Sequence, residues 1–253
     1  MRGARIGYLA DFVNPASATA ADVSALAQQA LSDLDAAGAV RVPLHFDAAD
    51  PLFALQGEIA GSIAAAGKDR YLWDRYLPTL GGVDFTGGDS GPFGTFLNRS
   101  WPQLFSNHPA LYRAVSVAAL LDKLQYSYDP AKESELFSKQ IALQEFVASY
   151  MDAQEIEAIV IPPVYNPALL EAGPERWRIE QGVTLSISYL ADDLISGLSS
   201  LPGLPALIVP AGFTPAGIPH GLQFVARAFD EAALIKLGYA YEQAARRRRG
   251  PSF

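Results

Sequence analysis

A strand, a helix and a second strand follow one another in the first 44 residues, and this order constrains the fold more than any other part of the sequence. ARIGYLADF (4–12) is a short apolar run that fits a strand, and AVRVPL (39–44) is another. Between them, apolar residues recur at helical spacing over 19–37, and Gly38 is a good helix stop. This βαβ pattern predicts parallel strands joined by a right-handed crossover.

The rest of the chain continues in the same alternating manner. Helical patterns occur at 51–80, 109–126, 131–154 and 183–199, around a glycine-rich loop expected at 81–95. Strand patterns occur at 156–164, 204–213 and 221–229, and Asp230 opens a last helix. No internal repeat or linker interrupts these patterns. We therefore expect a single α/β domain over residues 1–253, with helices covering both faces of its sheet.

The composition excludes several classes of function. The chain has no cysteine, which excludes disulfides, thiolate metal sites and cysteine nucleophiles, and its three histidines are too scattered to indicate a metal site. We expect neither a metal nor a cofactor. A formal net charge of −8 argues against nucleic acid as a partner, because a phosphate backbone binds clustered Lys and Arg. The one basic cluster, Arg246 to Arg249, follows a helical pattern, where cations suit the helix dipole.

A membrane is not expected as a partner either. No apolar run approaches the ~18 residues of a membrane span. Asp11 interrupts the apolar segment near the N-terminus after a few residues, which is not the pattern of a signal peptide. The sequence therefore predicts a cytoplasmic protein.

The glycine-rich stretch VDFTGGDSGPFGTF (83–96) raises the possibility of a nucleophile at Ser90. A serine hydroxyl needs a base to take its proton, and no motif connects Ser90 to His45, His108 or His220. GGDSG also lacks the strand, sharp turn and helix of a G-x-S-x-G elbow, and Pro92 follows directly. A turn that uses glycine for positive φ is the favoured interpretation of this stretch.

Two other kinds of site find little support. No lysine follows these glycines at P-loop spacing, and no G-x-G-x-x-G follows the first strand, so nucleotide binding is not indicated. Asp192 and Asp193 are neighbours in a helical pattern, as are Glu133 and Glu135, and neighbours on a helix point in different directions. These carboxylates are better explained as solvated faces or caps than as an acid and base pair.

The C-terminal segment LPGLPALIVPAGFTPAGIPHGLQFVARAFDEAALIKLGYAYEQAARRR (201–248) closely resembles the closing segment of the amidase signature family. There, a G-x-P-A-x-x-x-P-x-G-F strand is followed by a turn, a G-L-Q strand and a helix that begins F-D-E and ends Y-E-Q. KQIALQEFVASYMDAQEIEAIVIPPV (139–164) resembles the family's helix and strand before a pocket loop. The resemblance implies the C-terminal half of an amidase signature fold, with a mixed, largely parallel sheet flanked by helices on both faces.

The resemblance also implies a chemistry, hydrolysis of a C–N amide bond by a nucleophilic Ser, a bridging cis-Ser and a Lys. The lysine must be neutral to accept a proton, so burial must lower its pKa. In the family these three residues precede the βαβ unit, and nothing in this sequence reproduces their pattern. Asp89 stands where a second serine is wanted, and Lys68 is too close to Ser90 to match the family's separation. The resemblance therefore implies no catalytic residue in this chain.

A split amidase follows as an expectation from this resemblance. A partner polypeptide would carry the missing N-terminal amidase half with its triad, and this chain would complete the sheet and the pocket for a small-molecule amide substrate. The chain alone is then expected to be inactive, with a long sheet edge and apolar surface exposed.

Three residues are implied as substrate contacts by the same resemblance. Asp193 falls where the family's tRNA amidotransferase branch has an aspartate that contacts the substrate's amino group; a solvated or capping role is the alternative. Pro163 and Tyr165 lie on the loop that matches the family's pocket-lining loop, with ordinary packing as the alternative. SSLPG (199–203) stands where that branch commonly has N-L-A-G, a departure that separates this chain from the branch's substrate.

Two classes of function stay open. One is the enzyme part just described, and the other is a non-catalytic binding or scaffold subunit that retains the fold. An unrelated hydrolase that uses Ser90 is a third hypothesis.

Overall fold

The computed structural model describes residues 1–10, 21–45, 51–81, 84, 91–96, 127–163 and 197–250. The chain divides into two compact units. The first comprises Met1–Gln56, Gln140–Leu170 and Ile187–Phe253, and the second comprises Gly57–Lys139 and Glu171–Ser186. The helical pattern at 109–126 lies outside the described residues. The expectation of a single domain over 1–253 stays a prediction.

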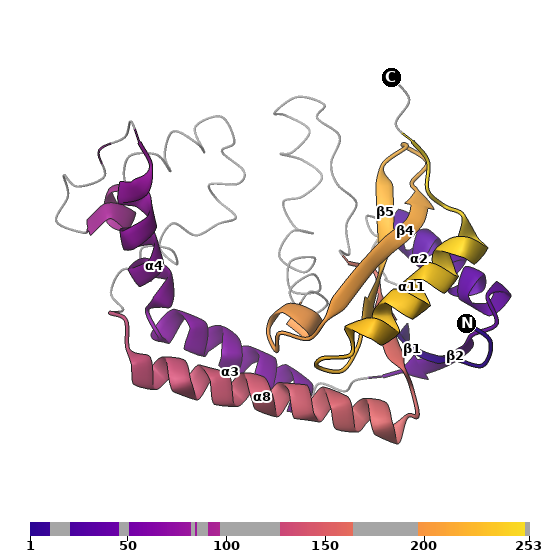
Figure 1. The fold of residues 1–253 in the computed structure, drawn as a ribbon, viewed down its shortest axis with the longest axis horizontal. Helices are drawn as coiled ribbons and strands as arrows, with labels where there is room; N and C mark the ends of the chain where they lie inside the picture. The colour runs from indigo at the N-terminus through magenta and orange to yellow at the C-terminus, as the bar shows by residue number, and fades with distance from the viewer. Residues whose placement is uncertain are drawn as a thin grey trace. The chain divides into compact units, whose positions relative to one another are not determined.

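A five-stranded sheet forms the centre of the first unit (Figure 1). Its strands follow the order β2-β1-β3-β5-β4. The strands are β1 Arg5–Leu9, β2 Val40–Leu44, β3 Ala158–Ile161, β4 Ala206–Phe213 and β5 Pro219–Val225. β1 pairs in parallel with β2 and β3, whereas β5 pairs antiparallel with β3 and β4. The sheet is therefore mixed and the fold is α/β, as the sequence predicts.

The N-terminal βαβ unit forms as its sequence predicts. Helix α2 (Ala21–Ala36) connects β1 to β2, and Arg5 pairs with Val40 in the parallel register. Gly38 ends the helix with a φ of 85°, while the N–H of Ala39 donates to the carbonyl of Leu34 at 3.0 Å. This left-handed glycine satisfies carbonyls that the last turn would otherwise leave without a donor.

Helices α2 and α11 (Glu231–Ala245) cover one face of the sheet, and Figure 1 shows α11 lying along β4 and β5. The core between them contains apolar side chains from both helices and from alternate strand positions. On β5 these are Leu222 and Phe224, and the Phe224 ring meets Tyr241 of α11 edge-on at 6.0 Å. The apolar residues that recur at helical spacing on α2 and α11 therefore pack against the apolar residues at alternate positions of the strands.

The opposite face of the sheet is also buried at its centre. Ile159 and Ile161 alternate along β3 with the core residues Ala158 and Val160, and all four are buried. Val225 and Gln223 alternate in the same way with Phe224 on β5 and are buried too. A central strand with no exposed position is typical of a sheet covered on both faces.

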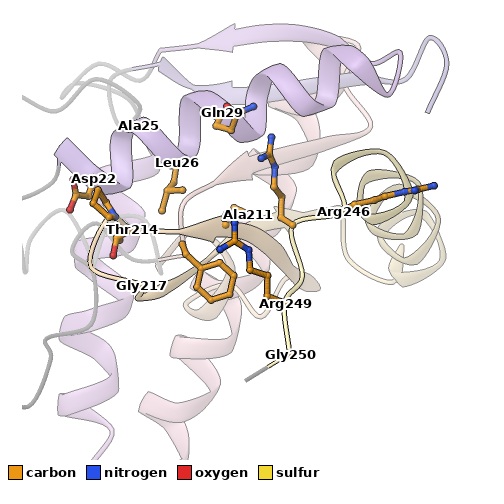
Figure 2. Close-up of a pocket in the computed structure, with 14 residues that line it drawn as sticks. Asp22, Ala25, Leu26, Gln29, Ala211, Thr214, Gly217, Arg246, Arg249 and Gly250 are labelled. Carbon is orange, nitrogen blue, oxygen red and sulfur yellow. The ribbon is translucent and has the colours of Figure 1, made fainter. Parts of the chain in front are cut away.

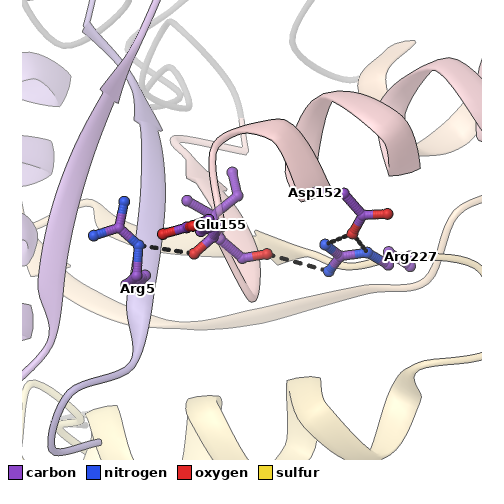
Figure 3. A network of polar contacts seen from close by, with 5 residues as sticks. Arg5, Asp152, Glu155 and Arg227 are labelled. Atoms are coloured by element: carbon purple, nitrogen blue, oxygen red, sulfur yellow. Dashed lines mark hydrogen bonds and ion pairs between the residues drawn. The ribbon is translucent and has the colours of Figure 1, made fainter.

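Two arginines hold the turn between helix α8 (Pro130–Ala153) and β3 (Figure 3). Glu155 in this turn is left-handed, with a φ of 54°. Arg5 Nε donates to the Glu155 carbonyl at 2.8 Å, and Arg227 Nη1 donates to the Ile156 carbonyl at 3.2 Å. Arg227 Nε also donates to Asp152 Oδ1 at 3.0 Å. The arginines thus donate to backbone carbonyls of the turn itself, beyond the last residue of α8.

The second unit contains α4 (Lys68–Tyr76), the 3₁₀ turn η2 (Leu77–Thr79) and most of α3 (Pro51–Ala65). Here a carboxylate, Glu133, accepts hydrogen bonds from Lys68 Nζ and Tyr128 Oη. The bond from Lys68, followed by that from Tyr128, lowers the pKa of Glu133 below its ordinary value.

The expectation of a loop throughout 81–95 is wrong at its end, because residues 91–96 are helical. Asp74 of α4 explains the difference. Its Oδ1 accepts a hydrogen bond from the N–H of Phe93 at 2.8 Å, which caps the new helix. Gly91 has a φ of 75°, and a Cβ there would lie 3.1 Å from Asp74 Oδ1. A cap from 19 residues upstream is invisible to local sequence patterns.

Across the part of the chain that the structure describes, no helix is both long enough and apolar enough to cross a membrane.

Candidate functional site

The three residues implied as substrate contacts differ in whether the structure describes them. Pro163 is described and lies two residues after the end of β3, in a half-buried position. Asp193 and Tyr165 lie outside the described residues, as does Ser90. The candidate site is therefore built outward from Pro163.

Pro163 lies against the sheet face opposite to α2 and α11. A Cβ on Gly221 of β5 would lie 3.6 Å from Pro163 Cγ and 2.5 Å from Ile208 Cγ2 of β4. The Ile208 contact is shorter than real Cβ atoms show, so only glycine fits at 221 without displacing its neighbours. The glycine thus lets Pro163, which follows β3, and Ile208 of β4 both lie close to β5, which runs between these two strands.

The segment before β4 is held on this face by two glutamines of α8. Gln140 Nε2 donates to the Leu201 carbonyl at 2.7 Å, and Gln144 Nε2 donates to the Pro202 carbonyl at 2.6 Å. Gly203 follows with a φ of 73°, a left-handed conformation that suits glycine. The side-chain amides of Gln140 and Gln144 therefore fix the turn into β4, in addition to the turn-forming tendency of its own residues.

Gln223 supplies the buried polar group of this face. Its Nε2 donates to Ser199 Oγ at 3.0 Å, which links β5 to the segment before β4. The sequence pattern places Gln223 in a strand motif and does not single it out as a site residue. The available indication was a lone amide at an inward position of an otherwise apolar strand, since buried amides require hydrogen-bond partners.

This arrangement combines polar and apolar groups on one face. The Gln223 amide and the Ser199 hydroxyl are hydrogen-bonding groups, and Pro163 lies beside the exposed Ile208. The side chain of Ile208 is 57% exposed, so this end of the β4 face is accessible. Among the described residues, no group of three or more His, Asp or Glu side chains is arranged to hold a metal ion.

Two lysines of the described residues make ion pairs. Lys68 pairs with Glu133, and Lys139 Nζ lies 2.9 Å from Glu135 Oε1 and donates to Ser62 Oγ. Both lysine side chains are partly exposed, at 41% and 24%. An amine that accepts a proton from a serine needs a desolvated site without a neighbouring carboxylate. Lys68 and Lys139 are each partly exposed and paired with a glutamate, so neither meets this requirement.

Solved structures with the same fold come from amidases. An amidase family protein from Bacillus anthracis superposes with a TM-score of 0.59 at 19% identity, over 100% of this chain and 40% of its own length. Peptide amidase from Stenotrophomonas maltophilia gives a TM-score of 0.57 at 22% identity, over 100% of this chain and 45% of its own. These superpositions show that the fold is shared.

Curated relatives from several organisms are subunits of glutamyl-tRNA(Gln) amidotransferase. The one from Synechococcus sp. is 26% identical over 247 residues, which cover 97% of this chain and 45% of that protein. The one from Brevibacillus brevis is 33% identical over 105 residues, 39% of this chain and 21% of that protein. The chain thus spans less than half the length of these relatives.

The family model described as Amidase matches residues 1–235, which include the whole sheet, the Pro163 turn and the Gln223 strand. This match covers most of the sequence and agrees with the mixed sheet described above. The chain belongs to the amidase family.

Proposed function

We propose that this chain takes part in the hydrolysis of a C–N amide bond by completing the sheet and one wall of the substrate pocket for a separate polypeptide that carries the Ser, cis-Ser and Lys triad. The family match over residues 1–235 carries this proposal. None of the residues of this sequence reproduces the pattern of that triad.

The wall that we assign to the pocket is the face of β4 and β5 beside Pro163. Gly221 allows a close approach to the strand, Gln223 fixes the segment before β4, and Ile208 offers accessible apolar surface. A pocket for a small amide needs this combination of apolar wall and few, well-placed polar groups. We propose that Asp193 and Tyr165 join Pro163 as substrate contacts.

The test begins with recovery of the chain at native abundance and identification of what co-elutes by mass spectrometry. We expect a stoichiometric partner with the glycine and serine-rich signature, and we expect amide hydrolysis by the complex but not by the chain alone. Release of ammonia or amine from a panel of small primary and secondary amides provides the measurement. A folded chain that is recovered alone and binds ligand without hydrolysis would instead support the non-catalytic role.

Variants of the complex separate substrate binding from chemistry. Asp193→Asn should raise KM with little change in kcat if the carboxylate binds substrate, and Asp192→Asn is the matched control next to it. Ser90→Ala should leave hydrolysis nearly intact, because no proton transfer passes through Ser90 in this scheme. Loss of several orders of magnitude in kcat for Ser90→Ala would overturn the scheme in favour of a hydrolase that uses this serine.

A further inference from the structure

Within the first unit, the arginine run that follows α11 is folded back against α2. Arg246 ends α11 in a left-handed conformation with a φ of 50°, and the chain then turns toward α2. Arg247 donates from Nε and Nη2 to the two carboxylate oxygens of Asp33 on α2, both at 2.8 Å. Asp33 is buried, so this bidentate pair fixes the tail in place.

A cavity of about 990 Å³, here called the tail groove, lies between α2, the end of β4 and the tail (Figure 2). One wall is the first half of α2, including Asp22 and Gln29, and the floor is Gly212 and Phe213. The tail forms the other wall with Arg247 and Arg249, whereas Arg248 does not line the groove. The groove belongs to the sheet face that carries α2 and α11 and therefore lies opposite to Pro163.

The tail groove presents opposite charges on its two sides. The Arg249 guanidinium lies over the Phe213 ring, 5.3 Å from its centroid, and forms no ion pair with a carboxylate of the described residues. Asp22 lies in the first turn of α2, across the groove from Arg249 in Figure 2. Asp22 and Arg249 are both exposed, so a ligand can reach both charges from solvent.

We propose that the tail groove binds a small zwitterion of the amino-acid type, with a carboxylate on Arg249 and an amine on Asp22. A guanidinium stacked on an aromatic ring is pre-organised for a planar carboxylate, because the ring restricts the side chain without using its donors. Asp22 and the net charge of −8 disfavour polyanions such as nucleic acid at the same place. This inference does not depend on the proposed function.

The experiment measures binding to the full chain by calorimetry, at constant ionic strength and neutral pH. The probes are glycine, 4-aminobutyrate and 6-aminohexanoate, which vary the distance between the charges, and hexanoate and inorganic phosphate, which lack the amine. We expect saturable binding of at least one amino acid, with a dissociation constant about tenfold lower than that of hexanoate.

Variants assign the two contacts. Arg249→Ala should weaken amino-acid binding about tenfold, and Arg249→Lys should restore part of it. Arg248→Ala, one residue away but outside the groove, should leave binding unchanged. Asp22→Asn should remove the preference for whichever amino acid binds over hexanoate. Circular dichroism melting of each variant confirms that it is folded.

Three results would overturn the inference. The first is no saturable binding of any of the three amino acids. The second is an equal loss of binding in Arg248→Ala and Arg249→Ala, which would reflect the general charge of the tail. The third is binding of phosphate or hexanoate as tight as that of the amino acids and insensitive to Asp22→Asn.

Discussion

Two neighbouring residues of β5 are constrained in different ways. A side chain at Gly221 would displace Ile208, because a Cβ there would lie 2.5 Å from Ile208 Cγ2. His220 is buried on the other face, where Leu222 and Phe224 belong to the apolar core. A cavity of about 360 Å³ beside His220 is also lined by Arg247, Arg248 and Arg249. A histidine in this position lacks solvation for its charged form.

Burial lowers the pKa of His220 below its ordinary value of 6.5. The unfolded chain then binds a proton that the folded protein resists, so the free energy of unfolding decreases as the pH falls below about 6.5. His220→Leu removes this contribution and keeps an apolar side chain on the strand. We expect the variant to lose less stability than the wild type between about pH 7 and pH 5, as measured by urea unfolding.

The same pH dependence in wild type and His220→Leu would show that His220 is protonated equally easily in both states, contrary to the prediction.

Among the secondary-structure elements, the sequence predicts those that local periodicity determines. The βαβ unit, α8, the three later strands and α11 all follow from their apolar spacing and their Gly or Pro boundaries. What the sequence does not predict are contacts between distant residues. Asp33 is buried among the mostly apolar inward residues of α2, and its carboxylate is paired with Arg247. Because Arg247 lies 214 positions away, no local pattern predicts this pair.

The α8–β3 turn allows one such distant contact to be measured. Arg227→Met removes the hydrogen bond to the Ile156 carbonyl and the ion pair with Asp152 while it keeps an unbranched side chain. We expect a loss of about 1 kcal/mol in the free energy of unfolding, because the carbonyl loses its donor.

Asp152→Asn separates the two contributions, since it weakens the ion pair and leaves the carbonyl bond. The Asp152 side chain is 70% exposed, so this variant should cost less than about 0.5 kcal/mol. An equal loss in Asp152→Asn and Arg227→Met would attribute the stability to the ion pair instead.

For the molecule as a whole, the sequence pattern indicates the family and the fold but only part of the site. Pro163 is identified from a loop after a strand, and its neighbours Gly221 and Ile208 come from strands about 50 residues later. Gln223 and Ser199 meet because β5 and the segment before β4 lie side by side. Such pairs depend on strand order, which no single stretch of sequence encodes.

The expectation of a single domain has a direct consequence for unfolding. The boundaries of the two units fall inside helices, between Gln56 and Gly57 of α3 and between Lys139 and Gln140 of α8. Helices form cooperatively, so one half of α8 cannot lose its structure without weakening the other. We therefore expect both units to unfold in one transition.

Tryptophan fluorescence tests this expectation, because all three tryptophans (Trp73, Trp101 and Trp177) belong to the second unit. Leu34→Ala creates a cavity in the core of the first unit, where Leu34 is fully buried, and should cost about 3 kcal/mol. In a single domain the variant lowers the urea midpoint of the fluorescence transition and of circular dichroism by the same amount. A fluorescence midpoint that stays at the wild-type value would mean that the two units unfold as separate domains.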